Sequence, residues 1–237
     1  MKLLSRLFFV CLLGLFTLAT LSATAAGRET RSVGAFTEVS LANSVTVILT
    51  QGSPQKVEAE GDADDLRHLE TTVSGSRLRI GNVRESNQSS YRFKGNVTVY
   101  VTAPTLTALS VSGSGMLKAA AGVQATELSL SLSGSGRLEL GQVQATKLHS
   151  SIAGSGTIAV AKGSISQHEV SISGSGSLKA GDLRSEACRV SISGSGNCYV
   201  TATRTLDASI MGSGDVFVGG NPKVSSSVMG SGKVHKS

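Results

Sequence analysis

The pattern of apolar and polar residues in the second half of the chain is organised around a tripeptide, Gly-Ser-Gly, which occurs seven times. Its copies begin at Gly113, Gly134, Gly154, Gly174, Gly194, Gly212 and Gly230. The interval between copies is nearly constant and becomes slightly shorter after Gly194. Such regular spacing indicates a repeat architecture, in which each repeat is one structural unit stacked on the next.

Apolar and polar positions alternate on both sides of each copy. The residue two before the first glycine is always aliphatic, and the residue three before it is always serine. The fourth residue after that glycine is aliphatic or cysteine, whereas the fifth varies; the two series are Leu117, Leu138, Ile158, Leu178, Cys198, Val216, Val234 and Lys118, Glu139, Ala159, Lys179, Tyr199, Phe217, His235. A period of two is typical of a strand with one buried face.

Repeats of this length predict an all-β fold, a parallel β-helix (β-solenoid) with about 18–21 residues per coil. Equivalent residues of successive coils then stack at the spacing of neighbouring strands, about 4.8 Å, so that each position becomes a column. The two glycines fit a corner, because glycine reaches positive φ and lets stacked backbones approach closely. We therefore interpret the tripeptide as a folding device and not as a phosphate- or calcium-binding loop.

The part of the chain that precedes the repeats has a less regular pattern. Residues 36–51 read as two alternating strands, joined by a turn near residues 42–43 and ended at Gly52. An acidic run opens residues 62–69 and predicts the cap of a short helix or turn, while residues 84–94 read as a polar loop. Further strands are predicted at residues 55–60, 76–80 and 96–102.

The chain begins with an apolar leader. Lys2 and Arg6 precede an apolar run at residues 7–21, and small residues follow it. This order is typical of a secretory signal peptide, and the run is shorter than the roughly 20 residues of a membrane-spanning helix. We expect an exported protein, periplasmic or at the cell surface, with no stable membrane span after cleavage. Its expected parts are a signal peptide (1–26), N-terminal strands and first coils (27–108) and regular Gly-Ser-Gly coils of the same solenoid (109–237).

Charge and composition narrow the classes of partner. The formal net charge is +6, and the basic residues are spread singly along the chain, without a cluster interleaved with aromatic residues. This distribution argues against a nucleic-acid partner. Aromatic residues make up only 4% of the chain and tryptophan is absent, which fits a narrow interior filled by aliphatic columns.

Two cysteines lie in the repeat region. Cys198 occupies an aliphatic column, and Cys188 aligns with Leu128 and Leu148 of earlier coils. Both positions favour buried free thiols that act as small apolar residues. A disulfide between the two cysteines is the alternative in an oxidising compartment.

The succession of strands and repeats resembles a known family. The residues that carry the likeness are Phe36, Val39, Leu41, residues 45–52, 57–61, 78–80 and 97–101, Leu106, Leu109 and residues 112–115. They resemble the putative auto-transporter adhesin head domain family, also called the GIN domain, a bacterial domain of unknown function. The resemblance covers essentially the whole chain after the leader. It implies a right-handed parallel β-helix exported to the cell envelope, and it supplies no catalytic or binding residues.

The sequence therefore favours a non-enzymatic, adhesin-like interaction module that uses an extended β-helix surface. Its expected partner is an envelope protein, a glycan or a second copy of the chain, and no cofactor or metal is expected. Large residues interrupt the outward columns near the C-terminal end and are the candidate interaction patch: Tyr199, Phe217, Met211 and Met229.

The alternative function is a polysaccharide lyase or glycoside hydrolase built on a β-helix. Such enzymes need a pair of carboxylates, or calcium ligands with a basic proton acceptor, on one face. The acids of the repeat region are not expected to form a column: Glu127, Glu139, Glu169, Asp182, Glu186, Asp207 and Asp215.

Overall fold

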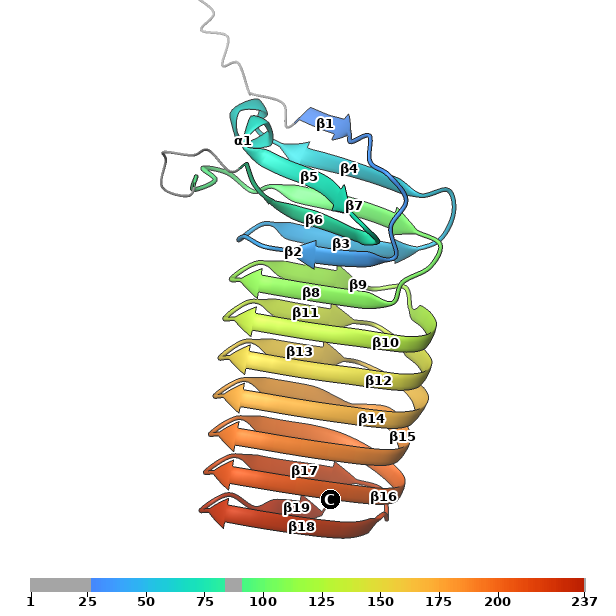
Figure 1. Cartoon of the computed structure of the whole chain (residues 1–237), viewed down its shortest axis with the longest axis vertical. Helices are drawn as coiled ribbons and strands as arrows, with labels where there is room; N and C mark the ends of the chain where they lie inside the picture. Colours follow the sequence, from blue (N-terminus) through green and yellow to red (C-terminus); the bar gives the residue numbers. More distant parts are fainter. Residues whose placement is uncertain (1–26, 84–90, 237) are drawn as a thin grey trace, which may run out of the picture.

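A computed structural model describes residues 27–83 and 91–236, and the predicted signal peptide lies outside these residues. The chain winds into a long stack of flattened coils with its two ends at opposite ends of the stack (Figure 1). The strands that face the viewer in Figure 1 form the front sheet, and the strands behind them form the back sheet. The chain runs to the left in front, returns to the right behind and descends, which is a right-handed winding.

The regular coils confirm the predicted parallel β-solenoid. The front sheet contains β8 (Ala108–Gly113), β10 (Val123–Gly134), β12 (Val143–Gly154), β14 (Gly163–Gly174) and β18 (Lys223–Gly230). The back sheet contains β9 (Met116–Ala119), β11 (Arg137–Leu140), β13 (Thr157–Val160), β17 (Asp215–Gly219) and β19 (Val234–Lys236). Two longer strands, β15 (Ser177–Gly194) and β16 (Asn197–Gly212), begin in the back sheet and end in the front sheet.

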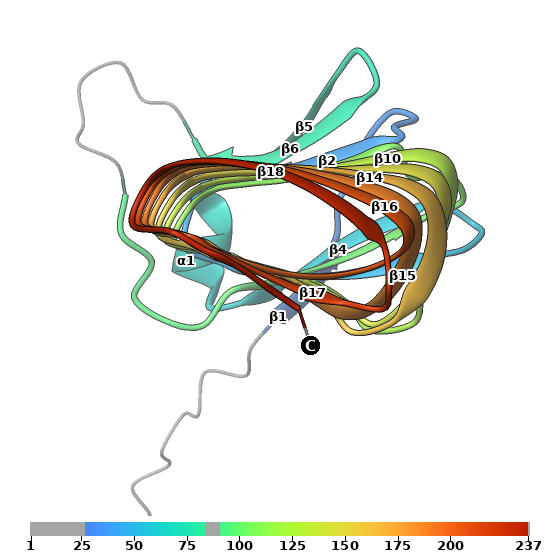
Figure 2. The ribbon, with the colours of Figure 1, turned by 90° about the horizontal axis from the view of Figure 1, so that it is seen from below.

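The pairing register reproduces the spacing of the tripeptide. Ser131 pairs with Ser110 on one side and with Ser151 on the other, and Ser209 pairs with Ser227. Each serine that precedes a tripeptide thus lies beside its counterpart in the neighbouring coil. All these pairings are parallel, and the coils nearly superpose when they are seen along the stack (Figure 2). Each position of the repeat therefore forms a column, as the alternation predicts.

The Gly-Ser-Gly segment makes the corner between the two sheets. The first glycine of each copy has a positive φ, for example +127° at Gly194, where a Cβ would lie 2.4 Å from the carbonyl oxygen of Gly174. The carbonyl oxygen of Gly113 accepts hydrogen bonds from the N–H groups of Ser135 and Gly136 in the next coil, at 3.0 and 2.9 Å. Glycine is thus required for its φ and for the close approach of stacked backbones.

The interior of the regular coils is filled by aliphatic columns with a few polar interruptions, and Ser185, one of them, donates a hydrogen bond to the carbonyl oxygen of Thr201. Ser150 and His168 are both inward and buried, and Ser150 Oγ lies 3.1 Å from His168 Nε2. Burial lowers the pKa of His168 to about 4. Cys188 and Cys198 are buried free thiols, as the aliphatic columns predict, and burial raises the pKa of Cys188 to about 12.

The N-terminal coils stack in an order that differs from the chain order. β2 (Glu38–Leu41) pairs with β8 on one side and with β6 (Arg77–Asn82) on the other. In the back sheet, β3 (Thr46–Gln51) lies in the same way between β9 and β7 (Thr98–Ala103). The coil formed by β2 and β3 is therefore held between two coils that both come later in the chain.

Antiparallel strands and a helix close this end of the stack. β4 (Lys56–Gly61) pairs antiparallel with β7, and β1 (Gly27–Thr30) pairs antiparallel with β4. β5 (Leu69–Ser74) and β6 form a hairpin, and α1 (Ala63–Arg67) precedes it. The strands predicted at 55–60, 76–80 and 96–102 are confirmed as β4, β6 and β7. β1, β5 and the antiparallel pairing were not predicted.

The C-terminal end has no comparable closure in the part of the chain that the structure describes. The inward residues of β18 are partly or fully exposed, and Val228 is 39% exposed. In residues 27–83 and 91–236, no helix is long and apolar enough to cross a membrane.

A candidate binding groove on the back sheet

One outward column of the back sheet combines charged, small and aromatic side chains. The register stacks Lys118, Glu139, Ala159, Lys179, Tyr199, Phe217 and His235 on successive coils. The sequence predicts this column correctly, because its members share one position of the repeat. We call it the mixed column.

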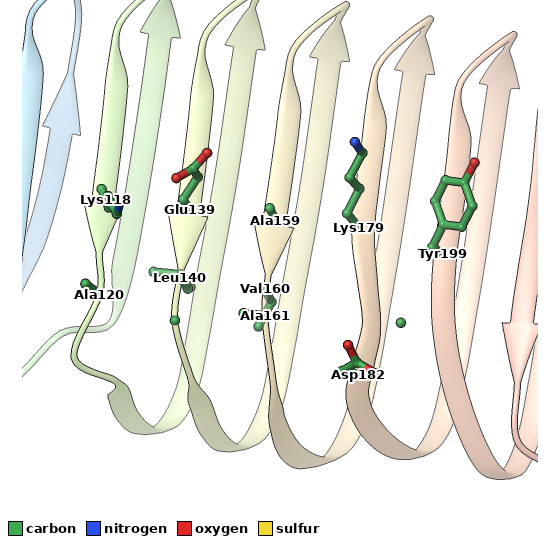
Figure 3. A pocket seen from close by; sticks show the side chains of 12 residues that line it. Lys118, Ala120, Glu139, Leu140, Ala159, Val160, Ala161, Lys179, Asp182 and Tyr199 are labelled. Atoms are coloured by element: carbon green, nitrogen blue, oxygen red, sulfur yellow. The ribbon is translucent and has the colours of Figure 1, made fainter.

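A row of small residues runs beside the mixed column. Ala120, Gly141, Ala161 and Gly181 follow the inward residue that ends each back-sheet segment. Between this row and the mixed column lies an open groove of about 700 Å³, which also contacts Asp182 at the corner (Figure 3). The groove reaches from the coil of Lys118 to the coil of Tyr199, a span of four strand spacings or about 19 Å.

The small residues that line the groove are small for different reasons. A Cβ on Gly141 would lie 2.2 Å from the carbonyl oxygen of Ala120, so backbone stacking alone requires glycine there. Gly181 has no positive φ, and its Cβ would meet nothing within 4 Å. The absence of a side chain at Gly181 therefore leaves space in the groove that the fold itself does not require.

An aromatic stack begins at one end of the groove. The rings of Tyr199 and Phe217 are parallel within 6° with centroids 4.6 Å apart, and the His235 ring continues the stack at 4.7 Å from Phe217. Tyr199 lines the groove and is 38% exposed, whereas Phe217 and His235 lie beyond it, toward the C-terminal end. Parallel aromatic rings at this spacing stabilise one another.

Charged side chains of both signs complete the groove. Lys118 and Lys179 are exposed on the mixed column, and Asp182 is exposed at the corner. Glu139 forms an ion pair with Arg137, two residues earlier on β11, at 3.4 Å. Donors and acceptors therefore alternate along the groove, beside an apolar ring.

The four residues of the predicted patch lie as two pairs on opposite sheets. Tyr199 and Phe217 stack on the back sheet, while Met211 and Met229 occupy paired positions on the front sheet. The two methionines are 50% and 64% exposed. The Gly-Ser-Gly corner separates the pairs, so the structure does not bring all four side chains together. The small row of the groove was missed, although a recurring alanine or glycine at one repeat position marks it.

The front sheet carries a second set of ionisable side chains. His149 lies between Glu127 and Glu169, with nitrogen-to-oxygen distances of 3.2 and 3.1 Å, and Arg189 lies 3.6 Å from Asp207. Glu169 and Asp207 occupy one column, on either side of Arg189. The seven acids of the repeat region thus form no common column, as expected, although Glu169 and Asp207 share one. The coil from Arg189 to Asp207 is shorter than the coil before it, and this change of length brings Asp207 into register.

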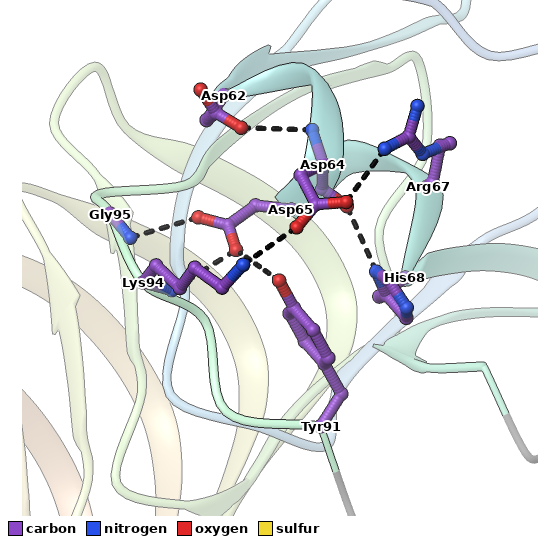
Figure 4. A network of polar contacts seen from close by, with 8 residues as sticks. All are labelled: Asp62, Asp64, Asp65, Arg67, His68, Tyr91, Lys94 and Gly95. Atoms are coloured by element: carbon purple, nitrogen blue, oxygen red, sulfur yellow. Dashed lines mark hydrogen bonds and ion pairs between the residues drawn. The ribbon is translucent and has the colours of Figure 1, made fainter.

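A polar network ties α1 to the segment before β7 (Figure 4). Asp65 is fully buried and accepts hydrogen bonds from Tyr91 Oη and from the N–H groups of Lys94 and Gly95, at 2.8, 3.0 and 2.8 Å. Burial opposes its ionisation, yet these donors together lower its pKa. Lys94 and Arg67 lower the pKa of the exposed Asp64 to about 2. All the groups of Asp65 are used inside the fold, which marks the network as structural.

The N-terminus of α1 matches the predicted acidic cap. Asp62 is the N-cap residue and accepts a hydrogen bond from the N–H of Asp64 at 2.9 Å. Within the described ranges, no group of three or more His, Cys, Asp or Glu side chains is arranged to hold a metal ion.

Comparison with known proteins places these features in a family context. A family model described as "Putative auto-transporter adhesin, head GIN domain" matches residues 35–222. A putative adhesin from Bacteroides fragilis superposes with a TM-score of 0.81 at 21% identity over 91% of this chain and 98% of its own. A putative lipid binding protein from Parabacteroides distasonis (TM-score 0.75, 25% identity) covers the same shares, 91% and 98%.

A putative adhesin from Parabacteroides merdae gives a TM-score of 0.72 at 19% identity, over 91% of this chain and 97% of its own. These structural similarities show the fold of the chain. Comparison with curated proteins gives no match.

Proposed function

Because the chain belongs to the putative auto-transporter adhesin, head GIN domain family, we propose that it is an exported, non-enzymatic binding module of the cell envelope that holds a glycan chain in the back-sheet groove. The observation that supports this most directly is the exposed ring of Tyr199 at the end of a groove with charged side chains along it.

The shape of the groove favours an extended ligand. It is open along its length and crosses the coils from Lys118 to Tyr199, about 19 Å, which suits a chain of several units better than a single compact molecule. Stacked strands also hold the lining side chains at fixed intervals, so the site is largely formed before the ligand arrives and little ordering is needed on binding.

The chemistry of the groove favours sugars among extended ligands. A sugar ring has an apolar face that can pack on an aromatic side chain such as Tyr199, and hydroxyl groups at its edge. Lys118 and Lys179 can donate hydrogen bonds to those hydroxyls, while Glu139 and Asp182 can accept them. The two charge signs are balanced in the groove, which favours a neutral or weakly charged glycan.

Two alternative functions must be distinguished from glycan binding: an enzyme that cleaves polysaccharide, and a protein that binds lipid. A lyase or hydrolase would use carboxylates as acid, base or nucleophile, and Glu139 and Asp182 are the acids that line this groove. A lipid ligand is suggested by the name of the Parabacteroides distasonis protein, but an acyl chain is better served by an enclosed apolar cavity than by an open groove with charged walls.

The direct test is binding of the purified protein to an array of bacterial and host polysaccharides, followed by titration calorimetry with the best ligand. Replacing Tyr199→Ala should weaken binding at least roughly tenfold, or about 1.4 kcal/mol. The matched control is Phe217→Ala, which removes the ring stacked on Tyr199 but leaves the groove lining unchanged; the affinity of this variant should stay within about twofold.

A second variant tests the groove without touching a polar group. Gly181→Leu places a side chain in open space beside Tyr199 and should block the ligand while the melting temperature stays unchanged. Glycan binding that is retained in both Tyr199→Ala and Gly181→Leu would show that the glycan binds outside this groove. Cleavage of the polysaccharide would show that the protein is an enzyme and not a binding module. Binding of lipid vesicles in place of glycan would support a lipid ligand.

A further inference from the structure

The last front strand, β18, presents a free edge. It pairs with β16 on one side, and no other strand in the described ranges pairs with it. Val228 and Met229 are 39% and 64% exposed, and Val224 is only partly buried. The apolar interior and a row of backbone groups are therefore both open to solvent at this end, which is the situation that favours pairing with another strand.

The register shows which backbone groups face the free edge. The N–H of Ser129 donates to the carbonyl oxygen of Thr107, in the coil toward the N-terminal end, at 2.9 Å. Successive pairings carry the position of Ser129 to Ser225. Neighbouring residues of a strand point their backbone groups to opposite sides, so those of Val224, Ser226 and Val228 point to the free edge.

From this geometry we infer that β18 pairs antiparallel with β18 of a second copy of the chain, around a two-fold axis at Ser226. In this register Ser226 lies opposite its own counterpart, and Val224 lies opposite Val228 of the partner copy. The residues whose backbone groups face the edge are also those whose side chains face inward. Pairing them joins the two front sheets and the two apolar interiors at once.

The sequence of β18 is self-complementary in this register. Shifting the centre by one residue, to Ser225 or Ser227, sets each valine against a serine, a proline or a glycine. Centred on Ser226, both valines meet valines, and Lys223 lies opposite Met229 of the partner copy, where its alkyl stem can cover the thioether. A two-fold pairing uses the same surface on both copies and leaves neither β18 edge open, so the front sheets end at a dimer.

This inference is independent of the glycan groove and is tested without ligand. Light scattering behind size-exclusion chromatography should give twice the chain mass for the purified protein. Ser226→Pro removes an N–H that the chain itself does not use, and proline is tolerated on the free side of an edge strand. This variant should elute as a monomer, with an unchanged circular dichroism spectrum.

Crosslinking tests the register in case the proline variant fails to fold. Opposed residues of a hydrogen-bonded antiparallel pair have Cα atoms about 5.5 Å apart, within the range of a disulfide. Ser226→Cys should therefore crosslink spontaneously between copies on a non-reducing gel. Ser227→Cys, one residue away on the outward face, lies opposite Ser225 of the partner and should not, and the buried Cys188 and Cys198 provide no background.

Three results would overturn the inference. The first is a wild-type protein that is monomeric at every concentration measured. The second is a Ser226→Pro variant that folds and remains dimeric. The third is equal crosslinking of the Ser226→Cys and Ser227→Cys variants, which would show contact without the register proposed.

Discussion

The two ends of the solenoid differ in how the last coil of the stack is covered. At the N-terminal end, β1, β4, β5 and α1 close the stack with antiparallel pairings and a buried carboxylate, whereas at the other end β18 repeats the coil before it and remains open. The closed N-terminal end is built from an irregular stretch of sequence, whereas the regular coils are built by repeating one pattern. Irregular and regular regions of this chain therefore have different weak points.

The strength of the regular coils lies in the contact between stacked backbones. From Gly134 onward, the first glycine of each corner approaches the carbonyl oxygen of the preceding coil so closely that any Cβ would overlap it. The strength of the closed end lies instead in hydrogen bonds to a charged group, since Asp65 satisfies three donors from one segment. Substitutions of the same size should thus have different effects in the two regions.

The largest effect is expected at a corner glycine. Gly194→Ala forces a Cβ to 2.4 Å from the carbonyl oxygen of Gly174 and places alanine at a φ of +127°. Backbone strain and overpacking together should lower the free energy of unfolding by about 4 kcal/mol. Urea denaturation measures this change in the free energy of unfolding. Gly181→Ala, with open space and no positive φ, is the control and should be neutral or slightly stabilising. Equal losses in both variants would contradict the role of close approach.

A somewhat smaller effect is expected at the closed end. Asp65→Ala leaves Tyr91 Oη and two backbone N–H groups without their acceptor and should cost about 3 kcal/mol. Its exposed neighbour supplies the control: Asp64→Ala removes surface ion pairs with Lys94 and Arg67 and should change the denaturation midpoint much less. Hydrogen exchange should show faster opening of β4 and β5 in Asp65→Ala but unchanged protection of β14. Opening of the whole stack together would show that the two regions are one cooperative unit.

The smallest effect concerns the buried pair of Ser150 and His168, and it depends on pH. Burial depresses the pKa of His168 to about 4, below the ordinary value of 6.5, so the unfolded chain takes up the proton first as pH falls. The contribution of His168 to stability is therefore constant above pH 6.5 and falls as the pH drops from there toward 4. Between pH 7 and pH 5 the loss should be about 2 kcal/mol.

The matched variant restores the aliphatic columns. Leu148 and Leu206 share the column of His168, while Val170 and Val190 share that of Ser150. The double substitution Ser150→Val and His168→Leu should remove the loss of stability between pH 7 and pH 5. A pH dependence that persists in the double variant would assign it to other groups. Carboxylates such as Asp65, whose pKa is lowered below its ordinary value of 3.8, would act only at lower pH.

The regular coils were predictable from the sequence because each physical requirement repeats. Aliphatic residues two before Gly113 and its six counterparts define the inward face, and the glycines define the corner. The N-terminal end was predicted as strands and first coils of the same solenoid, without the order in which the strands pair. Which strand pairs with which depends there on contacts between residues such as Glu38 and Arg77, far apart in sequence and without a repeated motif.

The candidate site was predictable only in part. The mixed column follows from one repeat position, so Tyr199 and Phe217 were expected side by side, as they are. The groove depends on the absence of side chains at Gly141 and Gly181. The alternation of apolar and polar residues does not predict such a groove. Met211 and Phe217 are close in sequence but lie on opposite faces, because the corner between the sheets separates them.

The coil of β2 and β3 has a consequence for how the molecule assembles. Glu38 pairs with Arg77 and with Ala108, both far along the chain, whereas every coil after that of β8 and β9 pairs only with coils one repeat away. Closing the long loops is entropically slow, while each later coil needs only a short loop on a template already in place. We expect a slow nucleation at β2 and β3 followed by rapid, one-directional winding, so that the number of coils can change between relatives without altering the rate-limiting step.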